Sequence, residues 1–218
     1  MTIIKKIRLL AAPTPAFVGT AFKIETDAEN PGAGIYSATL AEGHGSGTVD
    51  WGDGTVEEIG GFTCLGHAYA TPGVRTVRLS DDFATLHYSS SDIMWPSSEP
   101  HNLQLRTFTS SARNLKKLDV SAFKSCVNLK TIDIAGSRIE TIEKNGFWLC
   151  TGLSGELWLP SVRSFGAGTG TMPPFNGCTG GITKIHFAAE HETAIRTTAS
   201  FKRDPTLGTG TAEVVFDA

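Results

Sequence analysis

Residues 49–55 read VDWGDGT, and residues 67–79 follow them with HAYATPGVRTVRL. In the first stretch a strand-like segment runs into an Asp-Gly pair, which suits a hairpin turn because glycine adopts a positive φ without steric cost. In the second stretch a Pro-Gly pair marks another turn, after which Val, Thr and Leu alternate with Arg. The two stretches predict an antiparallel, Ig-like β-sandwich for the first third of the chain.

The composition agrees with a β-rich fold. The chain has 218 residues, 24 of them glycine, and only 19% are charged, which is typical of a turn-rich β architecture. This length suits one large domain or two small ones. No run of 18 apolar residues occurs, so we expect no membrane insertion. The apolar part of residues 1–12 is too short for a secretory signal, and we expect an N-terminal arm or edge strand there.

The charge changes sign along the chain. Residues 25–99 hold twelve acids and two bases, whereas residues 103–145 hold eight bases and four acids. Such a change is consistent with a domain boundary, and the basic density is too low for a nucleic-acid binder. We therefore expect no nucleic-acid partner, one domain over residues 1–92, a second over residues 93–218, and a connection at residues 97–102.

The second half of the chain carries a repeat. The pattern F-x-x-C occurs at residues 123–126, 147–150 and 175–178, and a strand-like apolar phrase follows each copy. These phrases cover residues 129–134, 153–159 and 182–187, and residues 105–110 and 115–120 have the same shape. Such a period with L-x-x-L-x-L cores predicts a leucine-rich solenoid, in which stacked turns share one core. A short helix over residues 188–196 and a final strand over residues 212–217 are expected to cap it, and the Gly/Pro stretch 166–174 to form a loop.

The four cysteines fit this repeat better than a metal or redox site. No C-x-x-C pair is present, which argues against a zinc finger or a thioredoxin motif. Cys126, Cys150 and Cys178 occupy equivalent positions, so we expect them to be reduced and buried in the core. A disulfide between neighbouring turns stays open if two Cα atoms come within about 7 Å. Cys64 precedes His67 without a third orienting group, so a catalytic dyad is disfavoured.

Alternation along the repeat phrases predicts which side chains face outward. They form two columns on one face: Thr107 and Thr109, Lys117 and Asp119, Thr131 and Asp133, Glu156 and Trp158, Lys184 and His186. The candidate ligand-binding residues are Lys117, Asp119, Thr131, Asp133, Glu156, Trp158, Lys184 and His186. Trp158 is the leading contact residue, because aromatic side chains are enriched at binding sites. The alternative for Trp158 is packing under a neighbouring loop.

Two patterns resemble metal sites without matching them. His186 and the Glu190-His191 pair differ by one residue in spacing from the H-x-x-E-H motif, and His186 falls on an expected strand. The acids within residues 50–57 do not have the spacing of an EF-hand. We expect Asp53 to accept backbone hydrogen bonds in its own turn, and the sequence gives no metal or other cofactor.

Residues 49–79 resemble PKD-type Ig-like domains, whose usual motif is WDFGDGT; here the motif is shortened because Trp51 and Gly52 are adjacent. The F-x-x-C repeats resemble BspA-type leucine-rich repeats of bacterial surface proteins. The resemblance implies a non-enzymatic module for cell adhesion that binds a protein or a carbohydrate ligand (a glycan) outside the cell, at the cell surface or on a virion. Two alternatives stay open: a structural assembly component of a phage or prophage particle, and a hydrolase built on the Gly/Pro stretch.

Overall fold

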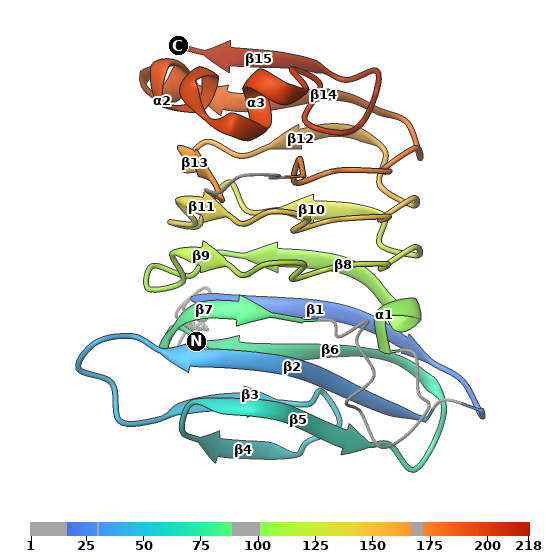
Figure 1. Cartoon of the computed structure of the whole chain (residues 1–218). Coiled ribbons are helices and arrows are strands. Elements are labelled where there is room, and N and C mark those ends of the chain that lie inside the picture. Colours follow the sequence, from blue (N-terminus) through green and yellow to red (C-terminus); the bar gives the residue numbers. More distant parts are fainter. Residues whose placement is uncertain (1–16, 30, 89–100, 167–171) are drawn as a thin grey trace, which may run out of the picture.

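The computed structural model describes residues 17–29, 31–88, 101–166 and 172–218, and the chain is mainly β (Figure 1). The first sheet has six strands. In spatial order they are β10 (Thr131–Asp133), β8 (Leu105–Ser110), β1 (Gly19–Thr26), β6 (Gly73–Ser80), β3 (Gly47–Asp50) and β4 (Val56–Ile59). All neighbours pair antiparallel except β8 and β10, which are parallel. The predicted strands around residues 49–55 therefore form the antiparallel pair β3–β4.

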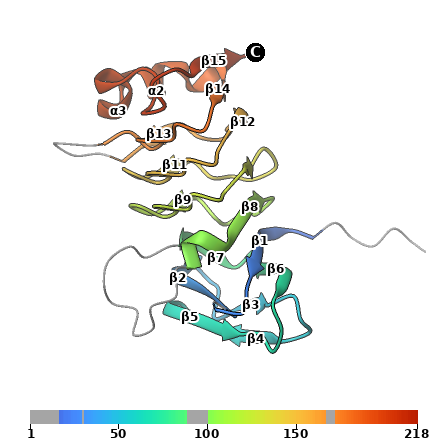
Figure 2. The ribbon, with the colours of Figure 1, turned by 90° about the vertical axis from the view of Figure 1, so that its right-hand side faces the viewer.

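The second sheet also has six strands. In spatial order they are β13 (Ser164–Phe165), β11 (Thr141–Ile142), β9 (Lys117–Leu118), β7 (Phe83–His87), β2 (Gly32–Leu40) and β5 (Phe62–Ala68). The pairs from β7 to β13 are parallel, and the pairs that β2 makes are antiparallel. The first and second sheets lie on opposite sides of the molecule (Figure 2), and apolar side chains from both fill the space between them.

The third sheet continues the line of the first sheet above β10 (Figure 1). Its parallel strands, in spatial order, are β12 (Gly155–Trp158), β14 (Ile182–Ala188) and β15 (Glu213–Asp217). The described helices are α1 (His101–Gln104), the 3-10 turn η1 (Ala189–His191), α2 (Glu192–Thr197) and α3 (Ala199–Arg203). The predicted C-terminal helix and final strand are thus present. The helices α2 and α3 lie above β13, where they cover the end of the second sheet's line (Figure 2).

The molecule therefore has two differently built parts. We call residues 19–87, which hold β1–β7, the antiparallel region. We call residues 105–217 the stacked region, because there the chain winds in successive turns that lie one above the other (Figure 1). Each of the first three turns supplies one strand to the first or third sheet and one to the second sheet. The sequence repeat, with one strand-like phrase after each F-x-x-C copy, had indicated only one strand per turn.

A column of phenylalanine rings joins the two regions. Phe22 of β1 lies 5.7 Å from Phe108 of β8, and Phe108 lies 4.6 Å from Phe123. Phe123 then stacks on Phe147 at 4.9 Å, and Phe147 on Phe175 at 5.3 Å, with nearly parallel planes. All five rings are fully buried. Because aromatic pairs add about 0.5–1.5 kcal/mol each beyond their burial, this phenylalanine column stabilises the contact between successive turns.

The repeated cysteines lie beside the column, buried and free, as predicted. The Cys150 thiol donates a hydrogen bond to the Phe123 carbonyl oxygen at 2.9 Å, and the Cys178 thiol donates to that of Phe147 at 3.0 Å. Burial raises the pKa of the Cys150 thiol well above its ordinary value. The thiols of Cys150 and Cys178 are therefore donors to the preceding turn, and the raised pKa of each keeps it protonated.

Backbone hydrogen bonds also connect each F-x-x-C turn with the next one. The backbone N–H of Phe123 donates to the Gly146 carbonyl at 2.7 Å, and that of Phe147 donates to Pro174 at 2.8 Å. The residue before each cysteine has a left-handed backbone, with φ of 58° at Ser125, 60° at Leu149 and 73° at Gly177. Such a conformation costs a non-glycine residue about 1–2 kcal/mol, so the repeated bonds must hold it in place.

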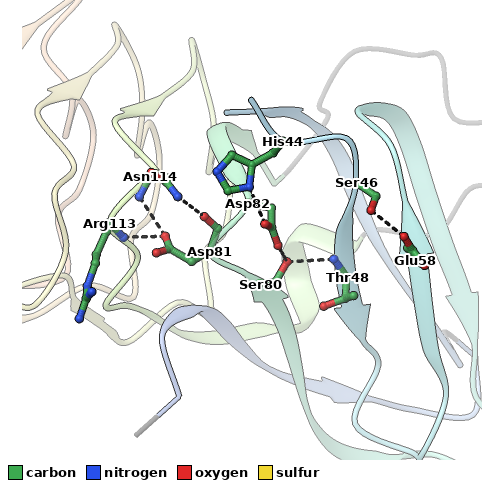
Figure 3. Close-up of polar contacts among 9 residues, drawn as sticks. All are labelled: His44, Ser46, Thr48, Glu58, Ser80, Asp81, Asp82, Arg113 and Asn114. Carbon is green, nitrogen blue, oxygen red and sulfur yellow. Dashed lines mark hydrogen bonds and ion pairs between the residues drawn. The ribbon is translucent and has the colours of Figure 1, made fainter. Parts of the chain in front are cut away.

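The boundary between the two expected domains stays a prediction, because residues 89–100 lie outside the described residues. So do the N-terminal arm and most of the expected connection at residues 97–102. Each of the two large sheets contains strands from before and from after this gap, and the apolar core likewise contains residues from both. Polar contacts also link the regions: Asp81, in the turn between β6 and β7, accepts hydrogen bonds from the backbone N–H groups of Arg113 and Asn114 (Figure 3).

Candidate functional site

The candidate site lies on the outer face of the third sheet and is centred on Trp158. The pleat of β12 buries Leu157 and turns Trp158 outward, where its side chain is 48% exposed. In the register of β12 with β14, Trp158 lies opposite His186. The two rings stack face to face, 3.9 Å apart and tilted by only 6°. Trp158 is therefore a flat apolar surface that is held in one orientation.

His186 lies under this ring and is buried between two carboxylates. Its Nδ1 lies 2.9 Å from Oδ2 of Asp217, and its Nε2 lies 3.4 Å from Oε2 of Glu156 without the geometry of a hydrogen bond. Lys184 reaches Glu156 at 3.9 Å. We call these five residues the Trp158 platform. Acceptor oxygens and one ammonium group thus surround a fixed aromatic ring.

Six of the eight candidate residues lie on the outer face of β10, β12 and β14, which follow one another from the first sheet into the third (Figure 1). Thr131 and Asp133 come from β10, Glu156 and Trp158 from β12, and Lys184 and His186 from β14. His186, which was expected to be open to a ligand, is only 6% exposed because the Trp158 ring covers it. A ligand on this face would therefore contact Trp158, and His186 would act only by supporting it.

Lys117 and Asp119 were expected on the same face, and this was wrong. Lys117 belongs to β9 of the second sheet, on the opposite side of the core, and its ammonium group lies 2.9 Å from Asp119. That hydrogen bond raises the pKa of Lys117. The phrase at residues 115–120 has the shape of the outer-face phrases, but the chain crosses to the second sheet before it, so alternation alone assigns it to the wrong side.

Asp217 belongs to the Trp158 platform, although sequence analysis did not select it. Its position follows from two successive parallel pairings, β12 with β14 and β14 with β15. The only signal in the sequence was an acidic residue at each end of the apolar run in the expected final strand, Glu213 and Asp217. Asp133 lies outside the Trp158 platform. It lines a hollow of about 250 Å³ together with Gly19, Ala21 and Thr109.

The antiparallel region holds a similar set of residues with a different environment. Trp51 is fully buried and stacks on His67 at 5.1 Å, while the Tyr69 hydroxyl donates to the Trp51 carbonyl at 2.8 Å. Asp53 accepts from the backbone N–H of Thr55 at 2.9 Å, as predicted, and lies 2.7 Å from Nε2 of His67. The hydrogen bond from Thr55, together with His67, lowers the pKa of Asp53 to about 2. These contacts close the β3–β4 turn and hold it against β5 of the second sheet.

One further cluster has the residue types of a hydrolase triad in a different order. His44 lies 2.7 Å from Asp82, and the Ser80 hydroxyl donates to the other oxygen of Asp82 (Figure 3). In a working triad the histidine lies between serine and aspartate and takes the serine proton. Here the aspartate is in the middle, and Ser80 also accepts from the backbone N–H of Thr48 at 2.9 Å. The cluster holds the β6–β7 turn against β3 and does not activate Ser80.

No group of three or more His, Cys, Asp or Glu side chains that could hold a metal ion occurs among the described residues. Within the same part of the chain, no helix is long and apolar enough to span a bilayer. Comparison of the chain with family models, with curated proteins and with solved structures found no match. The proposals below therefore depend on the geometry of this molecule and on the sequence patterns described above.

Proposed function

We propose that this chain is a non-enzymatic binding or adhesion module that recognises a protein or glycan through the outer face of β10, β12 and β14. In this proposal the antiparallel region is a PKD-type sandwich and the stacked region is a BspA-type leucine-rich solenoid, as in bacterial surface proteins. The F-x-x-C column and the two facing sheets support that assignment. The module would work outside the cell, at its surface or on a virion.

The observation that carries the proposal is the exposed and immobilised ring of Trp158. The ring is half exposed, and nothing in the described fold covers its outer part. Stacking on His186 fixes its orientation, so little side-chain entropy remains to be lost when a ligand binds. A rigid aromatic side chain beside fixed hydrogen-bonding groups is typical of the energetic centre of an interface.

The test is a glycan and host-protein array probed with the whole chain, followed by affinity measurements on each hit. Trp158→Ala should weaken binding by about 2 kcal/mol or more, as expected for an interface centre. Lys117→Ala is the matched control, because Lys117 has the same strand pattern but lies on the opposite sheet. Unchanged affinity of the Trp158 variant, or equal losses in both variants, would contradict the proposal.

A further inference from the structure

A polar pocket lies at the edge of the stacked region, beyond the ends of β10, β12 and β14. Its volume is about 420 Å³, within the range of small-molecule sites. Three successive turns line it with Ala135, Arg138 and Glu140, then Pro160, Ser161 and Arg163, then Ala188, Glu190 and His191. Six of these nine side chains are able to form hydrogen bonds, and the three others are small. We call this site the turn-edge pocket.

The charges on one side of the turn-edge pocket are balanced between turns. Glu140 forms an ion pair with Arg163 of the next turn, and its other oxygen lies 3.6 Å from the ammonium group of Lys116 in the preceding turn. The carboxylate of Glu140 is thus shared between two cations. Glu190 lies at the rim, 79% exposed, and its nearest basic group is the imidazole of His191 at 3.7 Å. The carboxylate of Glu140 is therefore already paired, whereas that of Glu190 faces solvent at the rim.

Arg138 is the cation that these pairings leave over. Its side chain has no ion pair or hydrogen bond with any described residue, although its backbone N–H donates to Ala112. Its backbone partner in the preceding turn is Ala112, and Ser161 of the next turn, which lines the same pocket, donates its hydroxyl to the Ser137 carbonyl. Among the described residues, no acceptor therefore pairs with the guanidinium group of Arg138, which carries five N–H donors.

We propose that the turn-edge pocket binds a carboxylated sugar, with Arg138 holding the carboxylate. Arginine pairs with carboxylates through two parallel hydrogen bonds, and the remaining polar lining offers both donors and acceptors to ring hydroxyls. A peptide is disfavoured, since the apolar lining consists only of Ala135, Pro160 and Ala188, which are too small to hold a large side chain. This site is separate from the Trp158 platform and does not depend on the function proposed for it.

The experiment is calorimetric titration of the whole chain with three probes: trigalacturonate, the neutral galactotriose, and acetate. Galactotriose keeps the sugar rings without the carboxylate, and acetate keeps the carboxylate without the sugar. We expect trigalacturonate to bind and the other two to bind at least about tenfold more weakly, because a hydrogen bond to a charged group is involved. Equal binding of either control probe, or no binding of trigalacturonate, would overturn the proposal.

Variants then locate the bound sugar. Arg138→Gln should weaken trigalacturonate binding about tenfold to a hundredfold. Arg113→Gln is the matched control, because Arg113 is exposed on the preceding turn and does not line the pocket; it should leave the affinity within about twofold. Trp158→Ala should also leave it unchanged. If Trp158→Ala abolished binding and Arg138→Gln did not, the sugar would sit on the platform and the pocket assignment would be wrong.

Discussion

Both regions contain a tryptophan ring stacked on a histidine whose imidazole is bonded to an aspartate. In the antiparallel region the set is Trp51, His67 and Asp53, and the indole ring is fully buried. In the stacked region the set is Trp158, His186 and Asp217, where the histidine is buried and the indole is half exposed. The same three residue types thus present the ring to the core in one region and to solvent in the other.

Burial of the ring is what distinguishes the structural set from the set that we propose binds a ligand. Around Trp51 the partners lie within 18 residues of one another in the sequence, and they join the β3–β4 turn to β5 of the second sheet. The set around Trp158 comes from three strands that are distant in sequence, and it closes no turn. An exposed ring contributes less to folding than a buried one, and the second set is the one that we propose contacts a partner outside the chain.

The largest expected contrast is in the effect of truncating the two tryptophans. Trp51→Ala should lower the free energy of unfolding by about 3–5 kcal/mol, because it empties a buried site. Trp158→Ala should lower it by less than about 1 kcal/mol, because it removes only one stacking contact at the surface. Urea unfolding of both variants measures this difference, and Trp51→Phe serves if the alanine variant does not fold. Equal losses would remove the distinction between the two sets.

The second prediction concerns the link between the regions. Asp81→Ala should cost about 1–3 kcal/mol, because the backbone N–H groups of Arg113 and Asn114 lose their acceptor. Asp81→Asn keeps an oxygen at this position and should cost less. We expect hydrogen exchange to accelerate in β1 and in β8 together, because the sheet and the core run through both. Faster exchange in the stacked region alone would show that the regions open independently.

The smallest expected effect is the pH dependence contributed by Asp53. Its pKa is lowered from 3.8 to about 2 in the folded chain, so its stabilising contribution is complete above about pH 4 and is lost as the pH falls towards 2. The advantage of the wild type over Asp53→Asn in unfolding midpoint should therefore shrink between pH 4 and pH 2. The effect is small because water screens a surface carboxylate. A constant difference across this range would contradict the contribution of Asp53.

Much of the fold could be predicted because its signals are local. The Asp-Gly and Pro-Gly turns indicated the strands around Trp51, and the F-x-x-C pattern indicated which residues are buried together. The pattern at residues 115–120 was misleading because the two strands of a turn have similar patterns of buried apolar residues. Only the pairing of β9 with β7 shows that Lys117 lies in the second sheet, and pairing between distant strands is not encoded in a local pattern.

The candidate site was predictable only in part for the same reason. Trp158 was found because a large aromatic residue stood at an outward position between charged neighbours. Asp217 was not, because its contact with His186 depends on the order of strands in the third sheet. Arg138 was also missed, since a charged residue in a turn is ordinary in sequence and becomes notable only when its side chain proves to have no partner among the described residues. Its recurrence at a fixed interval with Arg113 and Arg163 was the available signal.

The outer faces of β8, β10, β12 and β14 follow one another along a single line, with neighbouring strands of a sheet about 4.8 Å apart. The register places Thr109 beside Asp133 and Trp158 beside His186, so each pair of neighbouring strands contributes one row of outward side chains. A polymer that lay along this line would gain one further row of contacts for each increment of its length. Its affinity would then climb in steps with chain length and level off once the last row was occupied.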